Sequence, residues 1–244
     1  MLNLAIRDAV LIDKLVTANR ILAKYGIVDG FGHISVRAPA PSGDGDTFYL
    51  SRSLAPASVT AADVQRFDLD GNTLDGDTRT PYLERFIHGE IYRVRSDVVA
   101  VVHNHSPSVI PFGATRTPLR PIYHMSSFIG SGSKHFEIRE SAGNTDMLVR
   151  NRPLGVALAD ALDQGSVVLM RGHGCTVVGA SIEQAVYRAI YTEMNARLQW
   201  QAGQLEGPIE FLSDEEGKRS TAANRGTLER PWELWKAQAL KRSR

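Results

Sequence analysis

Apolar residues recur at helical spacing in four segments of the chain. Residues 4–25 carry them every three or four positions, and a second stripe follows Thr80 and Pro81, which have the composition of an N-cap and a first helical residue. Residues 153–162 form a third stripe. The fourth and longest begins after Ser181, whose surroundings read as a capping box. The pattern predicts a helix in each segment.

Short apolar runs between these helices have the length of strands. They lie at residues 34–36, 48–50, 65–69, 98–102, 167–170 and 175–178. Turn-forming residues are densest at residues 39–46, and Thr60 is an N-cap for a short helical turn. Strands and helices alternate without one clean β-α-β rhythm. We therefore expect an α/β fold, a single domain with a mostly antiparallel or mixed sheet.

The C-terminal part of the chain differs in composition from the rest. Beyond about residue 207 it is charged, with an aromatic patch at Trp232 and Trp235. We expect a catalytic domain at residues 1–206 and a tail at residues 207–244 that packs on this domain or on a neighbouring subunit.

Composition and charge narrow the class of protein. The chain has 244 residues, of which 43% are hydrophobic and 23% charged, and this excludes a disordered chain, a collagen-like repeat and a coiled coil. The formal net charge is +1, so neither nucleic acid nor an anionic membrane is an expected partner. Local positive charge must hold any anionic ligand.

Two further features suggest a compartment. Cys175 is the single cysteine, which rules out an intramolecular disulfide and fits a reducing environment. The first fifteen residues include charges at Arg7, Asp8, Asp13 and Lys14, and they lack both the apolar core of a signal peptide and a membrane span. We expect a cytoplasmic enzyme.

His103 and His105 are the strongest chemical signal. They follow the apolar run at residues 98–102, and residues two apart on a strand point to the same face. Two imidazoles placed in this way can bind one metal ion. The spacing alone is equally compatible with two structural or surface histidines.

His173 lies in an Arg-Gly-His-Gly turn after another apolar run. The flanking glycines allow a sharp turn and leave room beside the imidazole. A histidine in a turn is usually no more than a turn residue. Combined with the other two histidines, however, it completes three nitrogen ligands, the protein set typical of a catalytic metal with an open position.

Glu84 precedes the His-x-His strand, in the first turns of the predicted helix. If that helix end faces the strand end, the carboxylate can reach the open metal position as a fourth ligand, as a general acid/base, or as both. The alternative is a glutamate that only complements the helix dipole.

Four histidines remain. His88 lies one turn beyond Glu84 on the same face, as a hydrogen-bond partner of the site or as a packed core residue. His33, in a glycine-rich loop, and His124, after Pro-Ile-Tyr, could both contact substrate. His135 is expected in a solvated loop.

The order of these segments resembles the class II aldolase/adducin family over roughly residues 10–205. The likeness is carried by GHIS, YLSRS, a Glu three residues after a proline, IYRVRSDVVAVVHNHSP and VVLMRGHG. It implies a three-layer α/β/α fold around a nine-stranded, mainly antiparallel sheet. It also implies a homo-oligomer, usually a tetramer, with active sites at subunit contacts. In this family His103, His105 and His173 would bind the divalent metal, and Glu84 would be the catalytic acid/base.

The chain departs from the family's sugar-phosphate aldolases at the segments that cradle phosphate. An imidazole, a guanidinium, a phenol and bulky apolar groups replace their small hydroxyl, amide and glycine residues. A sugar phosphate is therefore not the expected substrate. Arg52 suits a carboxylate, and Phe31, Tyr82 and Leu83 suit an aromatic ring. The expected substrate-binding residues are His33, Ser35, Ser51, Arg52, Ser53 and Tyr82.

This pattern resembles a branch of the family that decarboxylates hydroxylated aromatic or pyridine dicarboxylates. The resemblance implies a small-molecule carboxylate substrate and a metal that acts as an electron sink, with Glu84 or His124 returning a proton to the ring carbon. His124 falls where the aldolases carry a catalytic tyrosine. Three histidines with a carboxylate suit zinc or manganese, and also cobalt or iron.

Three alternatives remain open. The first is aldolase (retro-aldol) cleavage of a non-phosphorylated hydroxy acid or sugar derivative. The second is a dehydratase or epimerase of the same family. The third is a non-catalytic, adducin-like interaction module, which would have no reason to keep all three histidines with the glutamate.

Overall fold

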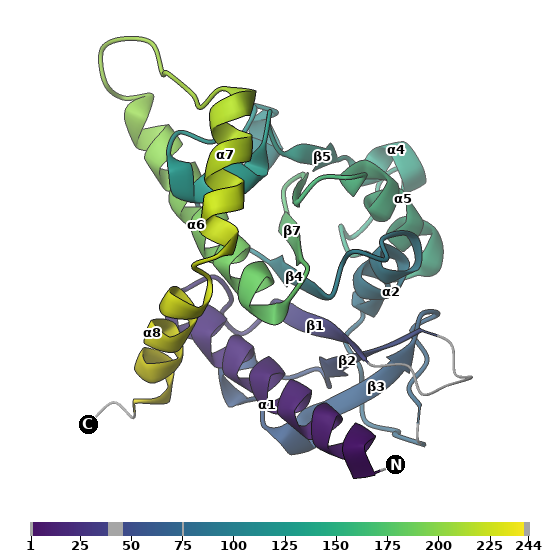
Figure 1. The fold of residues 1–244 in the computed structure, drawn as a ribbon. Coiled ribbons are helices and arrows are strands. Elements are labelled where there is room, and N and C mark those ends of the chain that lie inside the picture. The colour runs from purple at the N-terminus through teal and green to yellow at the C-terminus, as the bar shows by residue number, and fades with distance from the viewer. Residues whose placement is uncertain (1, 39–45, 75, 242–244) are drawn as a thin grey trace.

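A computed structural model describes residues 2–38, 46–74 and 76–241. Their strands form one seven-stranded sheet with the order β3-β2-β1-β4-β7-β6-β5 (Figure 1). The strands are β1 (His33–Ala38), β2 (Thr47–Ser51), β3 (Val64–Asp68), β4 (Ala100–Asn104), β5 (Lys134–Phe136), β6 (Val167–Met170) and β7 (Gly174–Gly179). Every neighbouring pair is antiparallel except β5 and β6. The mixed, mainly antiparallel sheet is confirmed, although it has seven described strands rather than nine. Most of the predicted turn at residues 39–46 lies outside the described residues.

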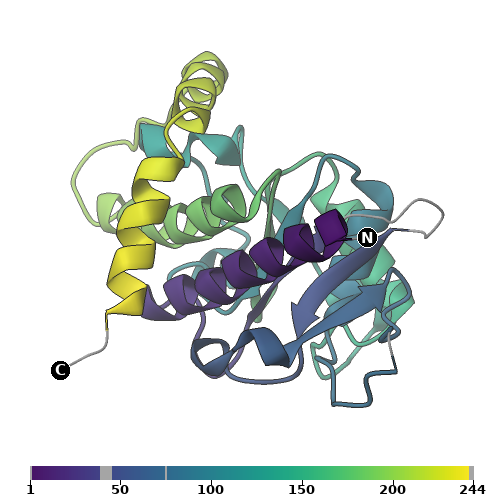
Figure 2. The same cartoon turned by 60° about the horizontal axis from the view of Figure 1, so that its bottom comes forward.

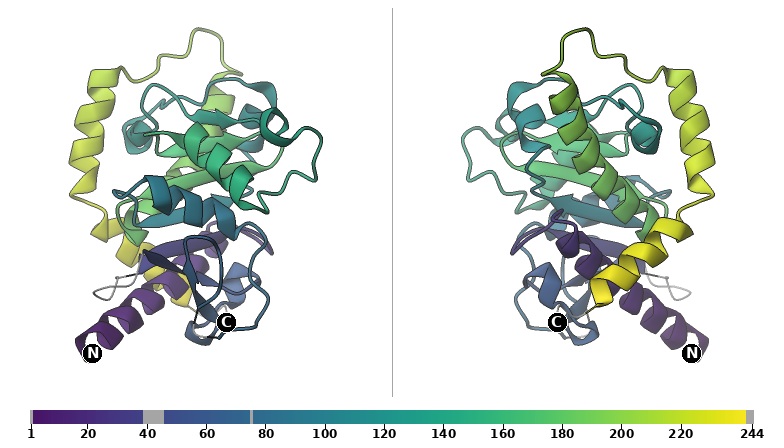
Figure 3. Two further views of the ribbon diagram at one scale, coloured as in Figure 1. Left: turned by 90° about the vertical axis from the view of Figure 1, so that its right-hand side faces the viewer. Right: turned by 90° about the vertical axis from the view of Figure 1, so that its left-hand side faces the viewer.

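Helices cover both faces of this sheet (Figure 3). They are α1 (Leu2–Lys24), α2 (Arg85–Val94), α3 (Ile110–Thr115), α4 (Ile138–Ala142), α5 (Arg152–Leu162), α6 (Ile182–Ala202), α7 (Asp214–Arg225) and α8 (Glu229–Leu240). Short 3-10 helices lie at Pro56–Ser58, Ala61–Asp63 and His124–Ile129. Helices α1 and α6 pack on one face, and α2 and α5 pack on the other.

Alternation along the strands divides the core into these two layers. On β4, Ala100 and Val102 belong to the cluster under α1 and α6, whereas Val101 belongs to the cluster under α2 and α5. Successive strand residues point to opposite faces, so a continuous apolar strand fills both layers at once. The α/β/α architecture follows from this arrangement.

The predicted start of α2 at Thr80 and Pro81 is wrong. Pro81 forms a β-bridge with Arg52, and the amide of Ser53 donates to the Thr80 carbonyl oxygen at 2.9 Å. These pairings extend the end of β2, and they keep residues 80–81 out of the helix. The helix begins only at Arg85, which places Glu84 at its N-cap.

The C-terminal segment forms two helices that pack on this same chain. Figure 2 shows α8 crossing the ends of α1 and α6. Trp232 and Trp235 are buried there, and the ring of Trp235 lies 5.7 Å from that of Tyr25. The boundary at residue 206 stays a prediction. Among the described residues, no helix combines the length and apolar character needed to cross a membrane.

Candidate functional site

Strand pairing brings the predicted histidines together at one end of the sheet. His103 ends the apolar part of β4, and its Cα partners are His33 on β1 and Thr176 on β7. His105 follows β4, and His173 lies in the turn between β6 and β7.

Two glycines shape the turn around His173. Gly172 has a φ of +62°, a conformation that favours glycine, and it allows the chain to reverse. Gly174 lies so close to β4 that a Cβ atom would stand 2.0 Å from the carbonyl oxygen of Asn104. The expectation that the flanking glycines provide a turn and room beside the imidazole is confirmed.

Glu84 joins these histidines in one cluster whose ligand atoms lie within 4.8 Å of one another. The Nε2 atom of His105 lies 3.2 Å from that of His103 and 3.0 Å from that of His173. Glu84 Oε2 lies 3.4 Å from His103 Nε2 and 3.6 Å from His173 Nε2. Ligands at 2.0–2.1 Å around a tetrahedral ion would be separated by about 3.3–3.4 Å. The observed separations fit that geometry.

The protonation states also fit a cation. His173 Nδ1 lies 3.0 Å from the Met147 carbonyl oxygen, which can only accept, so this nitrogen carries the proton and leaves the Nε2 lone pair facing the cluster. Burial lowers the pKa of His173 to about 4, and it also lowers the pKa of His105. Neutral imidazoles are the form that binds metals.

Glu84 is buried and held by its outer oxygen. Oε1 accepts a hydrogen bond from the Val149 amide at 3.0 Å, which leaves Oε2 for the cluster. Burial alone would raise the pKa of Glu84, but His103, His173 and the Val149 amide outweigh it and lower the pKa to about 2. The carboxylate is ionised, as a ligand or an acceptor of protons requires.

Residues 147–149 support both halves of the cluster, and the sequence analysis did not identify them. Met147 provides the carbonyl for His173, and Val149 provides the amide for Glu84. Met147 has a φ of +73°, which is unusual for a residue with a side chain. These contacts are made by backbone atoms, so no side-chain motif announces them. The one local sign in this loop is the strained Met147 itself.

A pocket of about 380 Å³ opens onto this cluster, a size that suits a small ligand. Its walls are mainly apolar, and Phe31 and Leu83 stand at its mouth with 70% and 56% of their surfaces exposed. The Tyr82 hydroxyl donates to the Leu54 carbonyl oxygen, which holds this ring against His33. The lining residues are Gly30, Phe31, Gly32, His33, Ser53, Leu54, Ala55, Tyr82, Leu83, Glu84, His105 and Leu148.

Three of the predicted substrate-binding residues, His33, Ser53 and Tyr82, line this pocket. Ser35 and Ser51 do not, because both are buried in their strands. Arg52 also lies outside the lining, since its Nε atom donates to Asp63 at 2.7 Å.

Three other histidines are placed as follows. His124 is exposed on a 3-10 helix, and its carbonyl oxygen accepts from Asn224. It does not line the pocket of its own chain. His88 is fully buried and contacts His33 rather than Glu84. His135 was expected in a solvated loop, but it lies on β5 with Nε2 2.8 Å from the Gly113 carbonyl oxygen, so this prediction is wrong.

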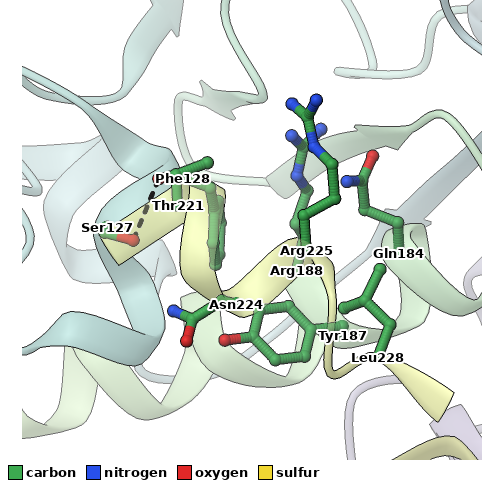
Figure 4. A pocket seen from close by; sticks show the side chains of 9 residues that line it. All are labelled: Ser127, Phe128, Gln184, Tyr187, Arg188, Thr221, Asn224, Arg225 and Leu228. Atoms are coloured by element: carbon green, nitrogen blue, oxygen red, sulfur yellow. Dashed lines mark hydrogen bonds between the residues drawn. The ribbon is translucent and has the colours of Figure 1, made fainter. Parts of the chain in front are cut away.

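A smaller cavity lies between α6, α7 and the 3-10 helix His124–Ile129 (Figure 4). A hydrogen bond of 2.9 Å between the hydroxyls of Ser127 and Thr221 connects two of its walls. Burial and the nearby Arg225 lower the pKa of Arg188 to about 10. None of the predicted site residues lines this cavity, so the chemistry belongs to the pocket above.

Known proteins resemble the chain in sequence and in fold. The sequence profile of the class II aldolase and adducin N-terminal domain matches residues 13–200. The decarboxylase tropJ of Talaromyces stipitatus is 38% identical over 238 residues, which cover 88% of each chain. The 3,4-dihydroxyphthalate decarboxylase of Arthrobacter keyseri is 34% identical over 218 residues, which cover 83% of this chain and 82% of that protein.

Solved structures share the fold at lower identity. An L-fuculose 1-phosphate aldolase from Glaciozyma antarctica superposes with a TM-score of 0.76 at 21% identity, over 98% of this chain and 94% of that one. The chain belongs to the class II aldolase and adducin family, and its cluster of Glu84, His103, His105 and His173 together with its decarboxylase and aldolase relatives makes it a carbon–carbon lyase of the kind that depends on a divalent metal.

Proposed function

We propose that this enzyme decarboxylates a hydroxylated aromatic or heteroaromatic carboxylate or dicarboxylate. The observation that carries the proposal is the pocket itself, in which apolar and aromatic walls lead to a cluster of three imidazoles and a carboxylate. A flat ring fits such walls, and oxygen atoms on the ring would meet the cluster. The similarity to a 3,4-dihydroxyphthalate decarboxylase supports the same substrate class.

In this proposal His103, His105 and His173 hold one divalent metal ion per subunit. A bound metal would withdraw electron density from substrate oxygens as the carbon–carbon bond breaks. The ligand set suits Zn²⁺ or Mn²⁺, and also Co²⁺ or Fe²⁺. The carbonyl of Met147 keeps His173 in the tautomer that this role requires.

Apolar surroundings favour loss of carbon dioxide because the departing carboxylate is held away from water. Phe31, Tyr82 and Leu83 provide these surroundings. Arg52 would bind a retained carboxylate through its two terminal nitrogens, which no hydrogen bond among the described residues uses. To reach the pocket it would turn away from Asp63.

A proton must then reach the ring carbon. Glu84 Oε2 faces the cluster and can accept and return a proton there. His124 could do so only from a neighbouring subunit, because it does not line the pocket of its own chain. A homo-oligomer, most simply a tetramer with active sites at subunit contacts, is therefore part of the proposal, as is a cytoplasmic location.

A panel assay tests this function. Metal-loaded enzyme is incubated with hydroxylated benzoates, phthalates and pyridine dicarboxylates, and the released carbon dioxide and aldehyde are measured separately. We expect carbon dioxide from at least one aromatic acid, and loss of this activity in His173→Ala with the fold intact. Release of aldehyde from a hydroxy acid, with no carbon dioxide from any aromatic acid, would favour an aldolase instead.

A further inference from the structure

A row of four polar side chains runs from the pocket into the layer between β1 and α2. His33 Nδ1 lies 2.7 Å from His88 Nε2, and His88 Nδ1 lies 2.6 Å from the Ser35 hydroxyl oxygen. This oxygen lies 2.8 Å from the hydroxyl of Tyr92. The exposed fraction is 3% for His33, 1% for Tyr92 and zero for the other two. Buried polar atoms at such short distances form a connected hydrogen-bond chain, in which the direction of one bond fixes that of the next.

The inner end of the chain sets that direction. The Tyr92 hydroxyl can donate to Ser35 at 2.8 Å or to the Val99 carbonyl oxygen at 3.3 Å. The shorter contact is to Ser35, and a phenol is a stronger donor than an aliphatic hydroxyl. The Val99 oxygen already accepts from the Arg37 amide at 2.7 Å. Tyr92 therefore donates to Ser35.

The remaining protons follow in order. Ser35 accepts from Tyr92 and donates its own proton to Nδ1 of His88. Neutral His88 then carries its proton on Nε2 and donates it to Nδ1 of His33. Neutral His33 must in turn carry its proton on Nε2. Since Nδ1 is turned toward His88, this N–H group is the polar atom that His33 has left for the pocket it lines.

We propose that Tyr92, Ser35 and His88 are positioning residues that hold His33 as the Nε2–H tautomer, a neutral hydrogen-bond donor that recognises a carboxylate or phenolate oxygen of the substrate. A group that is itself a donor would meet another donor at this position, so the chain also determines specificity. The identity of the bound oxygen rests on the proposed function, whereas the tautomer of His33 does not.

A matched pair of variants at position 88 separates this role from simple packing. In His88→Gln, the amide nitrogen stands near the former Nε2 and can still donate to His33. In His88→Asn, the amide lies near the former Nδ1, and it reaches Ser35 but not His33. The two variants remove the same ring, so a purely structural role predicts similar effects.

The first measurement is ¹⁵N NMR of metal-loaded protein with labelled histidine, in which protonated and bare ring nitrogens have well-separated shifts. Signals of His33 are assigned by their loss in His33→Gln. We expect a proton on Nε2 in the wild type and in His88→Gln, and a mixture of tautomers in His88→Asn. A wild-type His33 with its proton on Nδ1 would overturn the inference.

The second measurement is the affinity for 3,4-dihydroxybenzoate by titration calorimetry. We expect His88→Asn to bind this probe about tenfold or more weakly, and His88→Gln to stay within about twofold of the wild type. Equal losses in both variants, with equal melting temperatures, would contradict the positioning role. Neither measurement needs turnover, so a protein that shows the Nε2–H tautomer but releases no carbon dioxide would refute the proposed function and leave this inference standing.

Discussion

At the scale of single residues, the two oxygens of Glu84 have separate tasks. The Val149 amide anchors Oε1, so Oε2 can bind a cation or exchange a proton without reorienting the side chain. A histidine cluster that already offers three nitrogens does not need a fourth protein ligand to hold a metal. We therefore assign the larger part of the Glu84 contribution to proton transfer.

Glu84→Gln tests this assignment. The amide preserves size and can still contact the cluster, but it cannot accept a proton. We expect the rate to fall about 10²–10⁴-fold while the metal content stays near that of the wild type, measured by steady-state kinetics and elemental analysis. Loss of the metal together with the rate would instead make Glu84 chiefly a ligand.

His88 predicts a pH dependence of stability. Burial lowers the pKa of His88 to about 3, against about 6.5 in the unfolded chain. Between these values the unfolded state binds the extra proton, so the free energy of unfolding falls as the pH falls. We expect metal-free wild type to lose about 1.4 kcal/mol per pH unit more than His88→Gln between pH 6 and 4, by urea unfolding. Parallel slopes for the two proteins would show that His88 is charged when folded.

At the scale of elements, the close approach of β7 to β4 is what brings His173 to the other histidines. Gly174→Ala would force these strands apart, because the new Cβ would stand 2.0 Å from a backbone oxygen. We expect a lower melting temperature and reduced metal content. Gly30→Ala is the matched control, since a Cβ there meets nothing within 4 Å, and it should change neither quantity. Equal behaviour of the two variants would mean that the strands adjust.

Sequence patterns predicted those parts of the site that side chains encode. Periodicity placed His103 and His105 at a strand end, and glycines marked the turn at His173. The start of α2 was wrong because Pro81 pairs with Arg52, a tertiary contact that overrides the local helix signal. The support from residues 147–149 could not be predicted, because it is made by backbone atoms of a loop.

At the scale of the whole molecule, one subunit leaves its pocket mouth partly apolar and exposed at Phe31 and Leu83. In the proposed oligomer a neighbouring chain would cover this mouth and provide His124. Mixing the inactive variants His124→Ala and His173→Ala before reassembly tests this arrangement, because some sites would then combine two intact residues from different chains. We expect the mixture to recover part of the activity. A mixture as inactive as its components would exclude sharing of His124.

The most direct test of the central claim is an anomalous difference map from crystals of metal-loaded enzyme, recorded on both sides of the absorption edge of the bound metal. We predict one peak per subunit, about 2.0–2.3 Å from the Nε2 atoms of His103, His105 and His173. A map without this peak in an enzyme that is catalytically active, or a peak at another place in the chain, would contradict the claim that these residues form the metal centre of the lyase.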